Sequence, residues 1–296
     1  MGKSGFIGIV GRSNVGKSTL LNRLVGQKIS IVSPKPQTTR FRILGIKTLP
    51  HAQAIFIDTP GLHSGGSCLS QELSRIPFQV LRESDLLLWM VAPEADLDVE
   101  EHSLLEEIKR AGRPTFLVIN KIDLLPKEML LPLISQLVRL WPFAEIVPIS
   151  ALQGENVDRL EDLILKYLPE GLPVFPASQL TEKPARLLCA EFIREKIFQQ
   201  THQEIPYAVA VSVDEFKEDK EKGLTSIYAT IYVEKESQKG ILIGKEGERL
   251  RHIGESARHE IEALTGSRVY LRLWVKVRRD WRRNREALKQ FGYLGS

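Results

Sequence analysis

A glycine-rich pattern near the N-terminus is the feature that most constrains the fold. Residues 11–18 read G-x-x-x-x-G-K-S, directly after an apolar run at 6–10 and at the start of an amphipathic stretch at 17–26. Glycines let backbone amides approach phosphate oxygens, and the N-terminus of the following helix adds positive potential. Lys17 can reach terminal phosphates, and Ser18 can ligate Mg²⁺. The pattern therefore predicts a phosphate-binding loop between a strand and a helix.

Apolar runs alternate with helical patterns up to residue 170. The runs lie at 6–10, 54–57, 86–91, 115–119 and 146–149. The helical patterns lie at 17–26, 70–83, 100–111, 130–140 and 156–168. Short, continuously apolar strands separated by helices are typical of a mostly parallel sheet with helices on both faces. We therefore predict an α/β domain at residues 1–170.

The rest of the chain has another order. Prolines and glycine break residues 171–184, which we predict to be a linker. Residues 185–296 then predict a smaller α+β domain of α-β-β-α-α-β order, ending in a basic segment. Its expected elements are a helix at 185–201, strands at 207–213 and 226–233 joined by the charged stretch 214–223, helices at 247–253 and 255–264, a strand at 269–277 and a basic helix at 280–291.

Charge and cysteine content limit the function classes. The 296 residues hold 41 Lys+Arg and 37 Asp+Glu, and residues 240–296 alone hold 13 basic and 7 acidic side chains. This excess indicates an anionic partner near the C-terminus or an ordinary solvated surface. The longest apolar run, at 86–92, is far shorter than the ~20 residues of a membrane span. Cys68 and Cys189 show no zinc-ligand spacing, so we expect no zinc and a reducing, cytoplasmic location.

A second motif selects the base of the nucleotide. Asn120, Lys121 and Asp123 form N-K-x-D at the end of the run 115–119. The Asp123 carboxylate can accept from the two donors of guanine, whereas adenine presents an acceptor there. Lys121 can lie along the base, and Asn120 can tie this loop to the phosphate loop. Ser150-Ala151-Leu152, after the run 146–149, can present a backbone amide to guanine O6.

Together with Asp58-Thr59-Pro60-Gly61, these motifs resemble the translation-factor-type GTPases. Asp58 is expected to hold Mg²⁺ through water, and the Gly61 amide to face the γ-phosphate. The resemblance implies that Thr39, with Thr38 as the alternative, completes the Mg²⁺ shell. The expected metal site is thus Ser18, Thr39 and Asp58 through water, and the expected catalytic residues are Lys17, Thr39 and Gly61.

The full predicted nucleotide site draws on four segments. It consists of Gly11, Arg12, Ser13, Asn14, Val15, Gly16, Lys17, Ser18, Thr19, Asp58, Thr59, Pro60, Gly61, Asn120, Lys121, Asp123, Ser150, Ala151 and Leu152. Leu62 stands where Ras-like enzymes carry a catalytic glutamine, so we predict slow intrinsic hydrolysis. Residues 63–67 suit a second switch by composition.

The C-terminal domain resembles a type II KH domain around its G-x-x-G turn, Gly244 to Gly247. In that fold the loop lies against the backbone of about four single-stranded nucleotides. Glu246 and Glu248 are unfavourable for phosphate, and Trp274 is expected in the core. The predicted RNA-binding residues are Ile243, Gly244, Lys245, Gly247, Arg249, Arg278, Arg279, Arg282 and Arg283.

A GTPase domain followed by a type II KH domain resembles the Era family of bacterial ribosome-assembly GTPases. Supporting stretches are residues 37–40, 58–63, 148–151, 205–207, 273–277 and 292–293. The resemblance implies GTP/GDP and Mg²⁺ as cofactors, and binding to the 3′ end of small-subunit ribosomal RNA. It also implies a nucleotide-switched chaperone of small-subunit assembly, acting as a monomer, with peripheral contact to the inner membrane. The alternative is a GTP-dependent adaptor that binds a membrane surface or protein partners.

Overall fold

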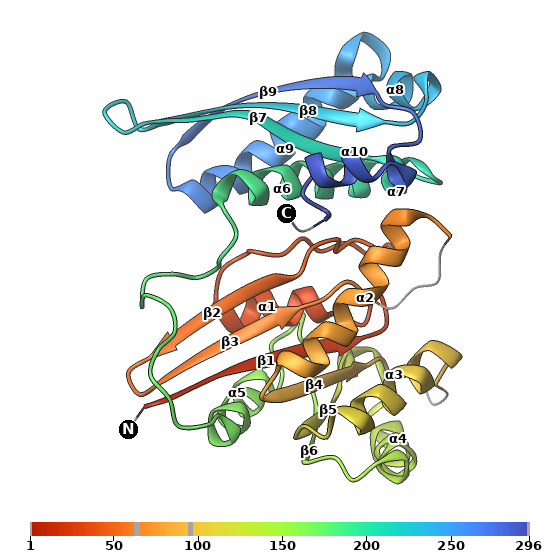
Figure 1. The fold of residues 1–296 in the computed structure, drawn as a ribbon, viewed down its shortest axis with the longest axis vertical. Helices are drawn as coiled ribbons and strands as arrows, with labels where there is room; N and C mark the ends of the chain where they lie inside the picture. Colours follow the sequence, from red (N-terminus) through yellow and green to blue (C-terminus); the bar gives the residue numbers. More distant parts are fainter. Residues whose placement is uncertain (1, 62–65, 94–96, 295–296) are drawn as a thin grey trace. The chain divides into compact units, whose positions relative to one another are not determined.

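The computed structural model, which describes residues 2–61, 66–93 and 97–294, divides the chain into two units, each with its own sheet (Figure 1). The first unit holds Met1–Ser30, Thr39–Gly65 and Leu73–Glu182. The second holds Lys183–Ser296 together with Ile31–Thr38 and Gly66–Glu72. Two short N-terminal segments thus belong by their contacts to the C-terminal unit.

The first unit is built on a six-stranded sheet of order β2-β3-β1-β4-β5-β6. The strands are β1 (Lys3–Gly11), β2 (Ile43–Leu49), β3 (Ala52–Asp58), β4 (Leu86–Val91), β5 (Thr115–Ile119) and β6 (Glu145–Pro148). All neighbouring strands are parallel except β2, which is antiparallel to β3. Every residue of β4 and of β5 is buried, which explains their continuously apolar sequences.

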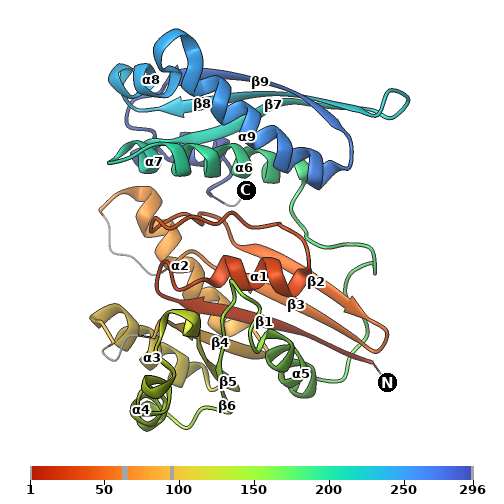
Figure 2. The ribbon, with the colours of Figure 1, turned by 180° about the vertical axis from the view of Figure 1, so that it is seen from behind.

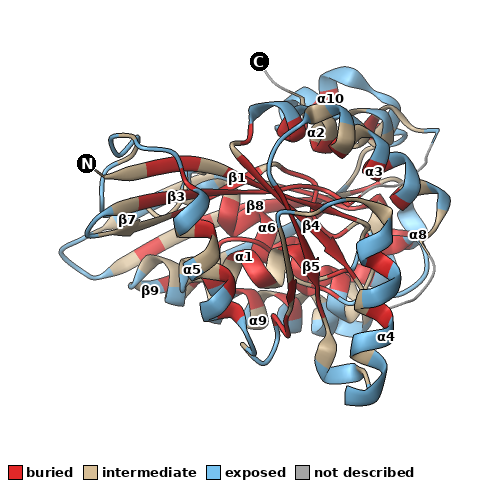
Figure 3. Cartoon of the chain, turned by 90° about the horizontal axis from the view of Figure 1, so that it is seen from below, coloured by how far each residue is buried: buried red, intermediate tan, exposed pale blue. Residues whose placement is uncertain are grey.

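Helices cover both faces of this sheet. They are α1 (Lys17–Val25), α2 (Cys68–Glu83), α3 (Val99–Ala111), α4 (Lys127–Leu137) and α5 (Val157–Tyr167). Side chains of α2, α3 and α4 form one core cluster with the strands, whereas α1 and α5 lie on the other face, in front of the strands in Figure 2. Figure 3 shows the buried strands between helices whose outer faces are exposed. This architecture confirms the predicted α/β domain.

The second unit has a three-stranded sheet of order β7-β8-β9. β7 (Ala210–Asp219) is antiparallel to β8 (Leu224–Val233), which is parallel to β9 (Arg268–Val277). The helices are α6 (Ala185–Gln200), the short α7 (Ile205–Ala208), α8 (Glu236–Ile243), α9 (Glu248–Thr265) and α10 (Arg285–Gln290). The order α-β-β-α-α-β is therefore confirmed, with α7 as an addition and α10 within the range predicted for a basic C-terminal helix.

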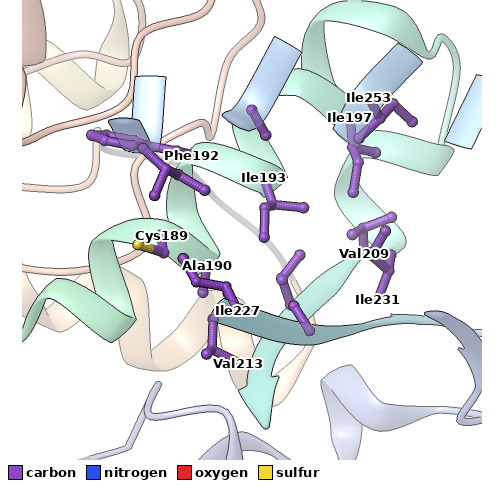
Figure 4. Packing of buried hydrophobic residues seen from close by; sticks show 14 of the residues in the cluster. Cys189, Ala190, Phe192, Ile193, Ile197, Val209, Val213, Ile227, Ile231 and Ile253 are labelled. Carbon is purple, nitrogen blue, oxygen red and sulfur yellow. The ribbon is translucent and has the colours of Figure 1, made fainter. Parts of the chain in front are cut away.

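The core of the second unit lies between α6, α9 and one face of the sheet. Figure 4 shows Phe192 and Ile193 of α6, Ile227 of β8 and Ile253 of α9 among these side chains, all of them buried. Along β8 the odd-numbered residues from Thr225 to Val233 are all buried, as expected for a sheet with one covered face. The C-terminal unit thus has a hydrophobic core of its own.

Several predicted element boundaries were wrong. Strand β2 was missed. The two helices flank the glycine turn as α8 and α9, whereas both were expected after it. Tyr207 lies in the short helix α7, which Pro206 favours near its first position. Strand β7 continues to Asp219 through the stretch expected to be a loop, because an edge strand tolerates charged side chains on its exposed positions.

The predicted linker packs along the first unit up to Glu182. The Ile46 amide donates to the Leu180 carbonyl oxygen at 2.8 Å, and the Gln53 side chain donates to the Phe175 carbonyl oxygen at 2.8 Å. These contacts attach residues 171–182 to β2 and β3. Among the residues with a described structure, no helix is both long and apolar enough to cross a membrane.

Candidate functional site: a nucleotide pocket and a basic groove

The phosphate loop connects β1 to α1 at the carboxyl end of the sheet. Lys17 is 5% exposed, and its Nζ donates to the carbonyl oxygens of Gly11 at 2.9 Å and Arg12 at 2.7 Å. Burial lowers the pKa of Lys17 to about 8, although the nearby Asp58 carboxylate acts in the opposite direction. The ammonium group is thus held at the loop, with little solvent around it, where an anionic phosphate would stabilise its charge.

Two glycines allow neighbouring loops to touch. A Cβ atom on Gly61 would lie 2.4 Å from the Ser13 Cα atom, and one on Gly16 would lie 2.2 Å from the side-chain Nδ2 of Asn120. Gly16 also has a φ of 102°, which L side chains rarely adopt. The segment after β3 and the loop after β5 therefore pack directly against the phosphate loop.

A set of oxygen ligands suited to Mg²⁺ surrounds Asp58. The Ser18 and Ser30 hydroxyls donate to Asp58 Oδ2 at 2.7 and 2.9 Å, and Ser18 Oγ lies 3.0 Å from Thr39 Oγ1. Asp58 Oδ1 is buried without a hydrogen-bond partner, and burial raises the pKa of this carboxyl group. An orphaned carboxylate oxygen beside two hydroxyls fits a hard cation that keeps several of its waters.

The two candidate threonines differ in their surroundings. Thr39 Oγ1 lies beside Ser18, whereas Thr38 Oγ1 donates to the Lys35 carbonyl oxygen at 2.7 Å. This geometry favours Thr39 as the residue that would complete the Mg²⁺ shell. Leu62 and His63–Gly65 lie outside the described residues, so the expectations for the catalytic position and most of the second switch stay predictions.

Asn120 joins the loops that surround the expected base. Its Nδ2 donates to the Val15 carbonyl oxygen at 2.7 Å, and its Oδ1 accepts from the Ala151 amide at 2.9 Å. Asp123 is exposed in the short turn Ile122–Leu124 after β5, and Lys121 has a φ of 65°. The structure thus brings Asn120 and Ser150–Leu152 together. The O6 contact from that segment stays a prediction.

In the second unit the G-x-x-G turn joins α8 to α9. Gly244 and Gly247 have φ values of 72° and 78°, so both glycines are needed for the backbone conformation. Arg249 Nη1 donates to the Ile241 carbonyl oxygen at 2.7 Å, which holds the start of α9 against α8. Lys245 is exposed at the tip of the turn.

A groove runs along α9 and β9, beginning at this turn. Its lining includes Gly247 and Leu250 at one end and three arginines along its sides. The arginines are Arg251 and Arg258 of α9 and Arg272 of β9, all exposed, and the lining also contains one exposed carboxylate, Glu255 of α9. The sequence analysis missed them. The signal was present, because residues seven apart on a helix, such as Arg251 and Arg258, share one face.

The predicted C-terminal arginine cluster lies elsewhere. Arg282 Nη2 pairs with Glu234 Oε2 at 2.5 Å, and Arg278 donates to Gln290 and covers the Phe291 ring at 5.3 Å. Arg279 lines a separate pocket together with Lys235 and the acidic residues Glu234, Glu236 and Asp280. Arg278, Arg279 and Arg282 thus have acidic or local neighbours, and the lining of the groove includes no member of the predicted C-terminal cluster. Trp274 was expected in the core, but it is 37% exposed.

Comparisons with known proteins match both units. Residues 6–121 match the family described as 50S ribosome-binding GTPase, and residues 204–282 match the KH domain. The GTPase Era of Syntrophus aciditrophicus is 50% identical over 99% of this chain and 96% of its own. That of Staphylococcus haemolyticus is 47% identical over 99% of this chain and 97% of its own.

Solved structures agree over the full length. Era in complex with MgGDPNP and nucleotides 1506–1542 of 16S ribosomal RNA is 45% identical, with a TM-score of 0.95 over 99% of each chain. Aquifex aeolicus Era bound to GDP and AlF4⁻ is 45% identical, with a TM-score of 0.94 over 98% of this chain and 99% of its own.

Proposed function

The chain belongs to the Era family of GTPases, and from this membership we propose that it is a nucleotide-switched RNA chaperone of small-subunit assembly. Its second unit would hold the single-stranded 3′ end of 16S ribosomal RNA. The observation that carries the proposal is the basic groove along α9 and β9, which begins at the G-x-x-G turn. A solved relative of the same fold is bound to nucleotides 1506–1542 of that RNA.

The chain hydrolyses GTP to GDP and phosphate, and we assign roles to the groups of the nucleotide pocket. Lys17 Nζ, now on two carbonyl oxygens, would contact the terminal phosphates and stabilise the charge that develops there. The Gly61 amide would orient the γ-phosphate. Mg²⁺, held by Ser18, Thr39 and, through water, Asp58, supplies further positive charge at the phosphates when bound.

Specificity for guanine is assigned to the loop after β5. Asp123 would accept from both guanine donors, and an adenine in the same place would leave the carboxylate facing an acceptor. Asn120 fixes this loop to the phosphate loop through Val15. With Leu62 in place of a glutamine that could orient water, we propose slow intrinsic hydrolysis.

RNA recognition is assigned to the groove rather than to the C-terminal arginines. Arg251, Arg258 and Arg272 present three exposed guanidinium groups along a path that begins at Gly247. Such groups attract the phosphates of a single strand, while Leu250 and Leu273 offer apolar contacts to its bases. We therefore replace the cluster Arg278–Arg283 by these three arginines as the main RNA contacts.

The position of the segment that precedes Thr39 supports a nucleotide switch. Thr39 lies beside Ser18 in the first unit, whereas Ile31–Thr38 belongs to the second. Within the second unit the Val32 amide donates to Glu195 Oε1 at 2.7 Å, and Arg194 Nη2 donates to the Thr38 carbonyl oxygen at 2.5 Å. Any γ-phosphate-dependent movement of Thr39 would therefore pull on a segment attached to α6.

The test is a fluorescence titration of a short single-stranded RNA from the 3′ end of 16S ribosomal RNA. It compares GDP with a non-hydrolysable GTP analogue at two salt concentrations, with a scrambled RNA and a large-subunit fragment as controls. We expect tighter binding with the analogue and a steep loss with salt. Equal affinity in both nucleotide states would leave RNA recognition but remove the switch.

The alternative, a GTP-dependent adaptor, predicts the opposite result for RNA binding. It requires binding to anionic vesicles or a protein partner and no RNA binding in either nucleotide state. We propose cytoplasmic action as a monomer, with any inner-membrane contact peripheral. Vesicle flotation and light scattering on the full chain test these two points directly.

A further inference from the structure

The sheet of the second unit presents two different faces. One face supplies Ile227, Ile231 and Val269 to the core shared with α6 and α9. In Figure 2 helix α9 lies in front of the strands, and in Figure 1, seen from the other side, the strands lie in front of α9. Because side chains alternate along a strand, the even-numbered residues of β8 and β9 point away from this core.

Three aromatic side chains stand together on that outer face. They are Tyr228 of β8 with Tyr270 and Trp274 of β9, which we call the aromatic row. The Tyr228 ring lies 6.0 Å from that of Tyr270 and 5.9 Å from that of Trp274, and the latter pair is nearly parallel, at 21°. Tyr270 is 48% and Trp274 37% exposed, which is unusual for large rings.

Positive charge is interleaved with these rings. Arg272, opposite Tyr228 in the β8–β9 register, places its guanidinium 5.0 Å from the centre of the Trp274 ring. Arg268 and Lys276 are also exposed on β9, and residues 268–277 contain no acidic residue. On β7 the exposed Lys217 pairs with Glu215, so that carboxylate has a cationic partner of its own. The surface is therefore both aromatic and cationic.

The aromatic row adjoins the RNA groove. Tyr270 and Arg272 belong to the row's strand and also line the groove beside α9. β9 is the edge strand of the sheet, so the groove and the outer face meet along it. An extended strand lying in the groove can thus continue around β9 onto the row without crossing another element of the sheet.

We propose that the aromatic row is a second contact surface for single-stranded RNA, which stacks the bases next to those held in the groove. The inference extends the proposed function and names a separate surface for it. Aromatic rings accept any base by its face, and interleaved arginines attract the adjoining phosphates, so this surface would bind with little sequence preference. The positive charge along β9, where residues 268–277 contain no acidic residue, favours an anionic strand as the ligand of this surface.

The chain offers a matched control on the same face. Tyr232 of β8 points the same way, but its ring packs against Phe291 at 4.9 Å. Replacing Tyr232 removes an aromatic residue from this face without removing a ring of the row. Arg251, which lines the groove only, reports on the groove itself.

The experiment measures affinity of the full chain, with Mg²⁺ and a GTP analogue, for two RNAs of one sequence. The shorter, of about four nucleotides, fills the groove, and the longer, of about twelve, extends beyond it. Trp274→Leu and Tyr228→Leu should each weaken the longer RNA by about fivefold or more and the shorter by less than about twofold. Trp274→Phe should retain most of the affinity, and Tyr232→Leu should match the wild type. Anionic vesicles serve as the competing ligand.

Photocrosslinking gives the second readout, independent of stability. A 4-thiouridine placed outside the groove segment should crosslink to Trp274, which does not line the groove. Equal effects on both RNAs, or crosslinks only elsewhere, would overturn the proposal, as would vesicle binding that depends on Trp274 while RNA binding does not. If the longer RNA depends on Trp274 but Arg251→Ala changes neither, the row stands and the groove assignment fails.

Discussion

The nucleotide pocket and the RNA groove bind phosphate by opposite means. In the pocket, Lys17 is 5% exposed and Asp58 fully buried, and both already have hydrogen-bonded partners. In the groove, Arg251, Arg258 and Arg272 are all exposed. A small ligand with dense charge can be enclosed, so each contact is strong and depends on its neighbours. A long, flexible strand meets a row of solvated contacts that act almost independently.

This contrast sets the expected size of substitution effects. Removing or crowding one group in a buried, interlocked site disturbs every partner of that group, and such effects are not additive. An exposed arginine contributes a phosphate contact that is screened by salt and adds to the others. Substitutions in the pocket should therefore be severe, and those in the groove graded.

The largest effect is expected for Gly61→Ala. Its Cβ would lie within 2.4 Å of the Ser13 Cα atom, so either the phosphate loop or the segment after β3 must shift. Overpacking of this kind costs about 1–3 kcal/mol, and we expect GTP and GDP affinity to fall by up to about a hundredfold. Fluorescent-nucleotide titration and thermal unfolding measure the two consequences.

Gly240→Ala is the matched control. Beyond the adjoining backbone of α8, in which Gly240 lies, no heavy atom lies within 4 Å of a Cβ at this position. Because alanine favours a helix over glycine, stability should stay equal or rise by about 0.5–1 kcal/mol, with nucleotide affinity unchanged. Wild-type nucleotide binding by Gly61→Ala would show that the loops are not packed as described.

Asp123→Asn should have the next largest effect. An asparagine cannot accept from both guanine donors, and a lost contact of this kind costs about 1–3 kcal/mol. GTP affinity should fall about tenfold or more, and affinity for xanthosine triphosphate should rise. Competition between the two nucleotides measures the change. Asp158→Asn, on the exposed first turn of α5, is the control, and unchanged GTP preference in Asp123→Asn would refute the guanine assignment.

Arg251→Ala should give a graded loss. We expect RNA affinity to fall about fivefold and the slope of affinity against salt to decrease by about one, with RNA-free GTP hydrolysis unchanged. Arg279→Ala, beside Glu234, Glu236 and Asp280, should change RNA affinity by less than about twofold. A larger loss of RNA affinity for Arg279→Ala than for Arg251→Ala would show that the C-terminal arginine cluster, and not the groove, makes the main RNA contacts.

The smallest effect concerns the two thiols. Burial raises the pKa of Cys189 to about 12, whereas Cys68 is partly exposed. The Cys189 thiol ionises at a lower pH in the unfolded chain than in the folded chain. Its contribution to the free energy of unfolding therefore decreases as pH rises from about 9 towards 12. Near neutral pH a thiol reagent should label Cys68 first and Cys189 only after denaturant is added. Equal rates would contradict the packing of α6.

The sequence predicted the parts of the molecule that depend on local patterns. The phosphate loop, the loop at Asn120 and the buried strands carry their own signals, because their chemistry requires certain residues at certain spacings. Strand β2 carries a weaker signal, since Gly45 interrupts it. That glycine is needed for packing, because a Cβ there would lie 2.5 Å from a Leu21 methyl group.

Features formed by distant segments could not be predicted in the same way. The groove arginines come from α9 and β9, and only the folded unit sets Arg272 beside Arg258. Trp274 was expected in the core because large apolar residues are usually buried. Here β9 did carry the signal. Trp274 shares its face with Arg272 and Lys276, whereas the intervening positions are all aliphatic, so the alternation along the strand places Trp274 on the outer face.

The side-chain amide of Asn120 has a consequence for how nucleotide leaves. One side-chain amide is hydrogen-bonded to both the Val15 carbonyl oxygen and the Ala151 backbone amide. The phosphate loop, the loop after β5 and the loop after β6 are therefore connected through a single residue. Loosening any one of them weakens the other two, and the pocket should open as one cooperative unit of local unfolding. An exchange factor would then need to bind and displace only one of these loops to release the base and the phosphates together.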